Sequence, residues 1–230
     1  MEEITAGCAD GGAVTFDWTL AWNILPTLLR AFGVTVQATL LGMSVAVCLG
    51  LLLAVLRRSS SAWLSWPSAW IVEFIRSTPL LVQIYFFFYV LPNLGVSWPP
   101  FLTGVAALGL HYSAYTSEVY RAGIDSVPRG QWEAAIALNL SPYRTFRSII
   151  LPQAIPPILP ALGNYLVAMF KDTPLLAAIT VNELLQSAKL IGAERFRYLE
   201  PLTMVGLLFL VASLASAHFI RILEARVAAR

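Results

Sequence analysis

Two pairs of ionisable residues stand in or beside long apolar runs, where a charge is costly and is therefore a candidate for a functional role. Glu73 and Arg76 are three residues apart, as are Glu118 and Arg121, so the members of each pair share a helix face and can form an ion pair. For the first pair, two interpretations have equal weight: a gate, and an ordinary ion pair at the membrane interface. For the second, we favour side chains that extend to the membrane interface.

A third charged group, Lys171–Asp172, follows an apolar run and precedes Pro174. A proline there indicates a helix end whose polar groups face a cavity, as in transporters with broken helices. A zwitterionic solute would need a carboxylate, a cation and an aromatic face, although most tyrosines in such helices only pack in the core. The predicted pathway or gate residues are Glu73, Arg76, Gln83, Tyr115, Glu118, Asn164, Lys171 and Asp172, with Tyr85, His111 and Tyr112 as further candidates.

The residues do not form a pattern for catalysis. The two lysines, Lys171 and Lys189, do not follow a glycine-rich loop, so a Walker A sequence is missing and ATP hydrolysis must occur in another chain. His111 and His218 stand alone in apolar runs, and histidines, cysteines and acidic residues do not have the spacing of a metal site. We therefore expect a chain without enzymatic activity or a metal.

The composition is that of a membrane protein. Of 230 residues, 58% are hydrophobic and 12% are charged, with a mean hydropathy of +0.71, whereas soluble domains carry about a quarter charged residues. The length allows one membrane domain, and the net charge of +2 is too small to indicate nucleic acid binding. Cys8 and Cys48 predict no disulfide framework, and a start without basic residues predicts that the first apolar run is retained.

Apolar runs and their interruptions predict an all-α fold with about five transmembrane helices. Residues 1–17 read as an acidic tail, 18–230 as a single membrane domain, and Trp18 to Leu29 as an interfacial segment. Four prolines in the fourth span predict a break or kink near its start. The predicted spans are 31–56, 67–91, 101–123, 148–170 and 201–220, with a partial helix at 181–190.

Five spans place the two termini on opposite sides of the membrane, and the positive-inside rule gives the orientation. In this topology the arginines of segments 57–58, 129–147 and 221–230 fall on one side, while the acidic tail and the uncharged 92–100 loop fall on the other. We therefore predict an N-terminus outside and a C-terminus in the cytoplasm.

One polar segment, between Pro128 and Pro160, predicts a short helix, a corner and a second helix that returns to the membrane. Asn139 suits the left-handed position that ends a helix, and Ser141 followed by Pro142 is a typical helix start. A soluble partner could hold such a corner. On shape alone, a loop that lies on the bilayer surface is an equally good interpretation.

The same segment carries a resemblance to a known family. Glu133-Ala134-Ala135, followed by Leu151-Pro152-Gln153-Ala154, resembles the coupling-loop signature of bacterial ABC importer permeases. RSTPLLVQ at 76–83, VPRGQWEAA at 127–135 and KDTPL at 171–175 are similar to the polar amino acid (histidine/glutamine-type) permeases. That family usually has glycine where Asn139 stands, but asparagine also tolerates a left-handed backbone, so we retain the coupling role.

The resemblance implies a type I ABC importer permease in the bacterial inner membrane, with a coupling loop at 125–145. It implies three partners besides membrane lipid: cytoplasmic ABC ATPase subunits that bind ATP and Mg²⁺, a second permease subunit (a copy or a different chain), and an extracytoplasmic solute-binding protein. The ATPase-coupling residues that it implies are Arg129, Gly130, Glu133, Ala134, Ala135 and Asn139.

The solutes that the resemblance implies are polar amino acids or related compounds. Residues 153–181 and 196–201 are most similar to permeases for ectoine and hydroxyectoine, and Pro157 stands where many relatives have arginine. Two alternatives stay open: an ion-coupled secondary carrier or channel that works without ATP, and a membrane scaffold without a pore. The carrier leaves the coupling loop unexplained.

Overall fold

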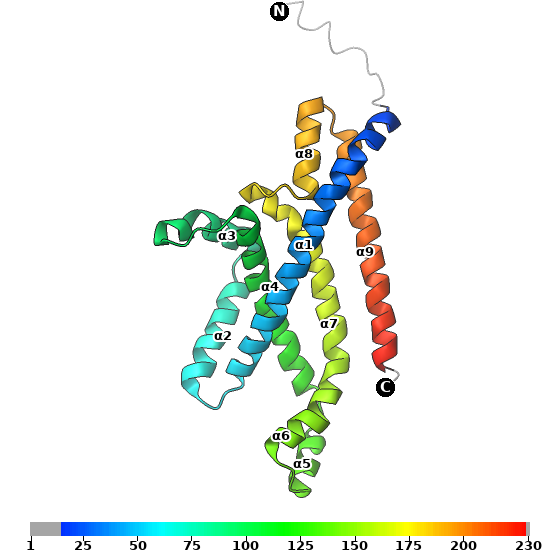
Figure 1. Cartoon of the computed structure of the whole chain (residues 1–230). Coiled ribbons are helices and arrows are strands. Elements are labelled where there is room, and N and C mark those ends of the chain that lie inside the picture. Colours follow the sequence, from blue (N-terminus) through cyan, green and yellow to red (C-terminus); the bar gives the residue numbers. More distant parts are fainter. Residues whose placement is uncertain (1–14, 229–230) are drawn as a thin grey trace, which may run out of the picture.

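The computed structural model describes residues 15–228, with side chains to 225, as a bundle of helices that contains no strand in this range (Figure 1). Of the predicted tail, 1–17, residues 1–14 with Cys8 lie outside the described residues, as does Arg230. The elements are α1 (Trp18–Arg57), α2 (Ala62–Arg76), α3 (Leu80–Tyr85), η1 (Phe86–Val90), η2 (Leu91–Leu94), α4 (Pro100–Asp125), α5 (Arg129–Ala137), α6 (Pro142–Thr145), η3 (Phe146–Ile150), α7 (Leu151–Asp172), η4 (Thr173–Ile179), α8 (Leu184–Arg195) and α9 (Leu199–Ala228).

Helix α1 is one continuous helix of 40 residues. The Asp17 side chain caps it by accepting hydrogen bonds from the backbone N–H groups of Thr19 (2.9 Å) and Leu20 (3.0 Å). These bonds, that from Leu20 above all, hold the pKa of the Asp17 carboxyl below its ordinary value. The predicted interfacial segment, Trp18 to Leu29, and the predicted first span, 31–56, belong to this one helix, because Pro26 is accommodated inside it.

Helices α1 and α4 run parallel to one another and in close contact. The buried face of α1 consists largely of small residues at helical spacing: Thr35, Ala38, Thr39, Gly42, Ala46, Gly50 and Ala54. Small residues let two backbones approach closely, which is a common basis for helix association in membranes. Thr116 of α4 uses this proximity, because its Oγ1 donates a hydrogen bond to the carbonyl of Ala46 at 2.8 Å.

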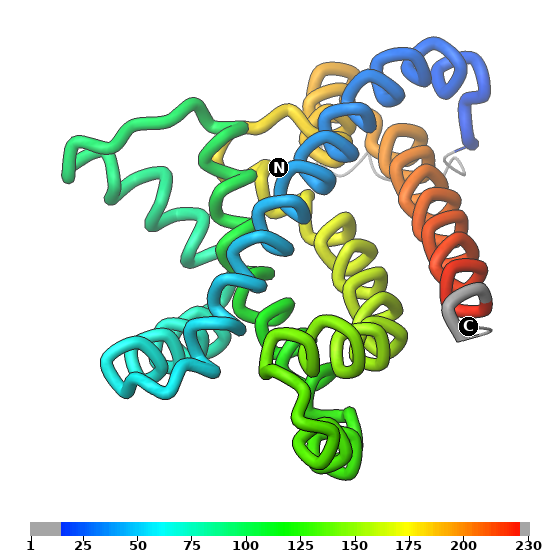
Figure 2. Tube along the Cα trace, turned by 60° about the horizontal axis from the view of Figure 1, so that its bottom comes forward, coloured from blue at the N-terminus to red at the C-terminus, as the bar shows by residue number. Residues whose placement is uncertain are grey.

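Three or four membrane-crossing units can be recognised by length and composition among the described residues, and α4 is a further long helix beside them. Within residues 15–228, three segments are long and apolar enough to cross a membrane, namely 18–57, 142–179 and 199–225, and α2 with α3–η2 is a fourth if the bent pair counts as one span. Helix α4, of 26 residues, does not qualify by composition but lies along α1 (Figures 1 and 2). The start of α1 and the end of α9 lie toward opposite ends of the bundle, as five spans require.

The predicted second span, 67–91, is not one helix. Helix α2 ends at Arg76, and the Leu80–Leu94 segment follows at an angle of 105°. Pro79 explains the position of the break, because proline lacks an N–H and forces the residue before it, Thr78, out of the helical conformation. We call residues 77–79 the elbow.

The fourth span is irregular near its start, as predicted, but its prolines do not break the helix. Helix α7 continues through Pro156, Pro157 and Pro160. The irregularity is a π turn, η3, directly before α7. A π turn contains an extra residue, which makes room before the first proline ring, that of Pro152. The partial helix predicted at 181–190 is longer and lies later, as α8.

Replacement of Gly50 by alanine should test the close contact of α1 and α4. A Cβ at Gly50 would lie 1.9 Å from Thr116 Oγ1 and 2.9 Å from the Ser113 carbonyl oxygen, so the helices must move apart. We expect a loss of about 1–3 kcal/mol in the free energy of unfolding, seen as a lower unfolding midpoint in detergent. Gly206→Ala in α9 is the matched control, because a Cβ there meets no atom within 4 Å. Equal stability of the two variants would contradict the packing described above.

Candidate functional site

The segment from α5 to α6 forms the predicted corner at one end of the bundle (Figure 1). Asn139 adopts the left-handed conformation (φ 52°), and the backbone N–H of Arg144 donates to the Ser141 side chain at 3.4 Å. The helix, corner and second helix are therefore confirmed, and asparagine fills the position at which the family usually has glycine.

The coupling residues predicted on this corner divide into one buried and five exposed positions. Ala135 is buried, whereas Arg129, Gly130, Glu133, Ala134 and Asn139 are exposed. The apolar side chains of the corner also divide, because Trp132 packs inward while Leu138 is exposed. Ile136 and Tyr143, which the sequence reasoning missed, add to the exposed apolar surface at 73% and 70% exposure. The corner thus offers an acidic side chain among apolar ones.

Glu118 of α4 joins three helices at their ends. Its Oε1 accepts hydrogen bonds from Arg57 of α1 (2.7 Å) and Arg76 of α2 (3.5 Å), and its Oε2 accepts from Arg121 (3.0 Å). The predicted pair of Glu73 with Arg76 also forms, but at 3.9 Å, so Arg76 lies nearer to Glu118. The predicted pairs are therefore parts of one network, and Glu118 does not simply extend to the interface. The sequence around Glu118 does not indicate its contact with Arg57, because the two residues are 61 positions apart.

A second set of predicted residues meets in an aromatic cluster between α4 and α7. The Tyr112 hydroxyl donates to Asp172 Oδ2 at 2.6 Å, and the Tyr165 ring lies 5.6 Å from the ring of Tyr115. The guanidinium carbon of Arg76 lies 5.7 Å from the centre of the Tyr115 ring. The cluster therefore adjoins the Glu118 network. Asn164 is exposed on α7 and has no side-chain hydrogen bond among the described residues.

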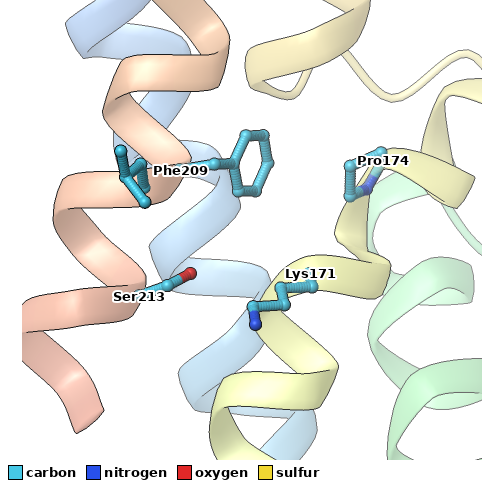
Figure 3. A pocket seen from close by; sticks show the side chains of 5 residues that line it. Lys171, Pro174, Phe209 and Ser213 are labelled. Carbon is cyan, nitrogen blue, oxygen red and sulfur yellow. The ribbon is translucent and has the colours of Figure 1, made fainter.

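Lys171 points away from its neighbour Asp172. A cavity of about 340 Å³ lies between the end of α7 and α9, lined by Lys171, Pro174, Phe209, Leu210 and Ser213. Figure 3 shows the lysine amine on the side of Ser213, with Phe209 and Pro174 further along the cavity. The amine has no ion-pair partner among the described residues. The helix end before Pro174 is confirmed. Its two charged groups have different neighbours, because Lys171 lines this cavity whereas Asp172 accepts the hydrogen bond from Tyr112.

Two buried carboxylates were not predicted. Glu183 caps α8 by accepting hydrogen bonds from the backbone N–H groups of Leu185 (2.9 Å) and Gln186 (2.6 Å), and burial raises the pKa of its carboxyl. Glu200, at the start of α9, accepts from the Asp17 backbone N–H at 3.0 Å and from Arg197. An acidic residue in the first turn of an apolar helix is a readable helix-start signal for Glu200.

The long apolar helices of the bundle define a multi-pass membrane protein. The chain belongs to the family of binding-protein-dependent transport system inner membrane components, whose model matches residues 46–229. It is a protein of the inner membrane, and the predicted resemblance to this class of permease is confirmed.

Relatives and a solved structure agree with this assignment. A probable amino-acid ABC transporter permease protein of Sinorhizobium fredii, y4tG, is 52% identical over 89% of this chain and 88% of that protein. The glutamine transport system permease protein GlnP of Escherichia coli is 34% identical over 92% of this chain and 97% of its own length. A crystal structure of an amino acid ABC transporter with histidines matches with a TM-score of 0.88 at 33% identity, over 92% of this chain and 99% of that chain. The predicted all-α type I importer permease fold is confirmed.

Neutralising Glu118 should weaken the bundle more than neutralising Asp125. Glu118→Gln leaves three arginines without their shared carboxylate, in a contact with Arg57 whose side chains are 17% and 23% exposed. Asp125 pairs with Arg58 in a more open place, at 47% and 37% exposure. We expect Glu118→Gln to cost about 1–3 kcal/mol of unfolding free energy and Asp125→Asn about 0.5 kcal/mol or less. Unfolding midpoints in detergent compare them, and a larger effect of Asp125→Asn would refute the central place of Glu118.

Proposed function

We propose that this chain is the permease subunit of an ATP-driven, binding-protein-dependent importer for polar amino acids or related compatible solutes. The observation that carries the proposal is the exposed α5–α6 corner, which presents Glu133 beyond the end of the bundle. The family supports a transport component that depends on a binding protein. Relatives described as amino-acid permeases support the solute class.

The proposed partners follow from the chemistry that the chain lacks. Its sequence has no Walker A pattern, so ATP and Mg²⁺ would be bound by separate ATPase subunits at the corner. A second permease subunit would complete the pathway across the membrane, and an extracytoplasmic solute-binding protein would deliver the solute. Lipid would cover the apolar outer faces of the helices.

The corner is built to move together with α7. The buried side chains of Val127, Ile150 and Ala154, with Trp132 packed on them, join the start of α5 to η3 and α7. Closure of an ATPase pair would therefore displace α7 along with the corner. For this to drive transport, the ATPase must bind the corner more tightly in one conformation of the permease than in the other, since equal binding shifts no equilibrium.

The proposed solute pathway runs along α4 and α7. In the aromatic cluster, Tyr115 of α4 faces α7, and Asp172 of α7 faces α4. A gate near the corner end of the bundle would consist of Glu73, Arg76 and Glu118. Asn164, exposed on α7, and the Lys171 amine would contact a solute that passes beside α7. The carboxylate of an amino acid or of ectoine is an anion of the kind that a lysine amine binds.

Reversing the charge of Glu133 should disconnect the ATPase. In the purified complex we expect Glu133→Arg to reduce the amount of ATPase that co-purifies, and to abolish the stimulation of ATP hydrolysis by solute-loaded binding protein. Glu194→Arg, an exposed charge reversal on α8 at the other end of the bundle, should leave ATPase association unchanged. Association and stimulation that both survive Glu133→Arg would show that the corner is not the coupling element. If no ATPase co-purifies with the parent chain, an ion-coupled carrier becomes the better hypothesis.

Solute uptake should separate the narrow substrate proposal from the broad one. We propose ectoine and hydroxyectoine as the specific solutes, on the strength of the similarity at 153–181 and 196–201. Cells that lack this chain should lose most uptake of labelled ectoine and regain it when the gene is restored. Undiminished ectoine uptake together with lost glutamine or histidine uptake would reject ectoine and keep the amino-acid permease. Loss of none of these would reject the solute class.

A further inference from the structure

The elbow between α2 and α3 leaves backbone carbonyls at the end of α2 without their helical partners. The last carbonyls of any helix lack intrahelical donors, and in a membrane water does not replace them. Ser77 N–H bonds the Glu73 carbonyl at 2.9 Å, but the Thr78 N–H lies at 3.4 Å from the Ile75 carbonyl. The Thr78 hydroxyl also donates to the Ile75 carbonyl, at 3.2 Å, so both bonds that this carbonyl receives from the elbow are long.

Gln83, on the first turns of α3, makes the shortest hydrogen bond to the Ile75 carbonyl. Its side-chain nitrogen donates to the Ile75 carbonyl at 2.8 Å and to Thr78 Oγ1 at 2.6 Å, with the Thr78 carbonyl at 3.3 Å. The amide carries two hydrogens, so these contacts use all of its donating capacity. A single side chain of α3 thus forms hydrogen bonds with both the end of α2 and the elbow.

The other end of the Gln83 amide is tied to α4. Its Oε1 lies 3.1 Å from Nδ1 of His111. Because Oε1 can only accept, Nδ1 must carry a proton and donate it. His111 is buried on α4, and its ring contacts those of Tyr112 (5.5 Å) and Tyr115 (5.2 Å), so it is itself well positioned.

We propose that Gln83 and His111 form a fastener that fixes the bend between α2 and α3 against α4, and that Gln83 is a positioning residue and not a ligand of the solute. Arg76, on the other side of the elbow, also reaches α4, through Glu118 and the Tyr115 ring. Both sides of the elbow are thereby attached to a single helix. The fastener sets the direction of the whole segment from Leu80 to Leu94.

The bend can be measured directly in the purified protein with its co-purifying subunits. Spin labels at Trp63 and Leu94, which are 90% and 69% exposed at the far ends of the two arms, report the distance between them by pulsed electron paramagnetic resonance. Cys8 and Cys48 are first replaced by serine, and labelled chains are diluted with unlabelled ones to suppress distances between copies. A change of about 20° in the bend would move the two ends by about 5 Å, given a rise of about 1.5 Å per helical residue.

Gln83→Met keeps the length of the side chain but removes its polar atoms, and we expect it to broaden or shift the distance distribution by about 5 Å, a helix-geometry estimate. His111→Phe removes only the link to α4 and should have a smaller effect of the same kind, while His111→Gln, which can still donate, should resemble the parent. Gln37→Met is the matched control, because Gln37 in α1 has no side-chain hydrogen bond among the described residues. Parent-like distances in Gln83→Met would overturn the fastener.

Transport kinetics then separate positioning from solute binding, a step that rests on the proposed function. With glutamine, histidine and ectoine as probes, a positioning residue predicts that Gln83→Met lowers the maximal solute-stimulated ATP hydrolysis at least threefold, with an unchanged half-saturating concentration. A raised half-saturating concentration with an unchanged maximum would instead make Gln83 a solute ligand and refute the proposal. If the parent shows no stimulation, the proposed function fails, whereas the distance measurement still decides whether the fastener exists.

Discussion

The close parallel contact between α1 and α4 is the constraint on which the rest of the structure depends. Helices in a bilayer gain little from hiding apolar surface from one another, because lipid is equally apolar, so their association relies on close packing and polar contacts. The close packing comes from small residues of α1, namely Gly42, Ala46 and Gly50, and the polar contact comes from the Thr116 hydroxyl of α4. Once α4 is fixed in this way, it can serve as the reference for every other element.

From this fixed position, three side chains of helix α4 bind the neighbouring helices. His111 binds the elbow through Gln83, Tyr112 binds the end of α7 through Asp172, and Glu118 binds the ends of α1 and α2. A movement of α7 must therefore either carry α4 with it or exchange the bond between Tyr112 and Asp172. Since α4 is locked to α1 by its small residues, the second course is the less costly one, and the contact between α4 and α7 is the natural place for a conformational change.

Features that depend on neighbouring residues could be predicted from the sequence, and features that depend on distant ones could not. The corner at Asn139 and Ser141 was predictable because a left-handed residue and a helix cap act within a few positions. The elbow was not, although Pro79 is plain in the sequence, because the structure accommodates other prolines such as Pro26 inside helices. The elbow at Pro79 is also attached to α4, by Gln83 to His111 and by Arg76 to Glu118, and these contacts join residues 28 and 42 positions apart, for which the sequence carries no local signal.

The candidate site shows the same division between local spacing and tertiary contact. Spacing predicted that Glu118 and Arg121 would pair, but it contained no information about Arg57. Lys171 and Asp172 are adjacent in sequence, yet neighbouring residues on a helix point about 100° apart, so they face different elements. The small-residue face of α1 was readable in the sequence at helical spacing, but its meaning depended on which helix would pack against it.

The predicted pathway residues differ in how much of their hydrogen-bonding capacity is already used within the protein. Gln83 has its donors and its acceptor oxygen engaged within the protein, and one carboxylate oxygen of Asp172 is held by the Tyr112 hydroxyl. A solute could bind these groups only by displacing bonds that hold helices together, which would couple its binding to helix movement. Asn164 and Lys171, by contrast, have no side-chain partner among the described residues, so a solute could reach them without such a cost. Along this pathway the first kind of residue suits the positioning of helices, and the second kind suits recognition of the solute.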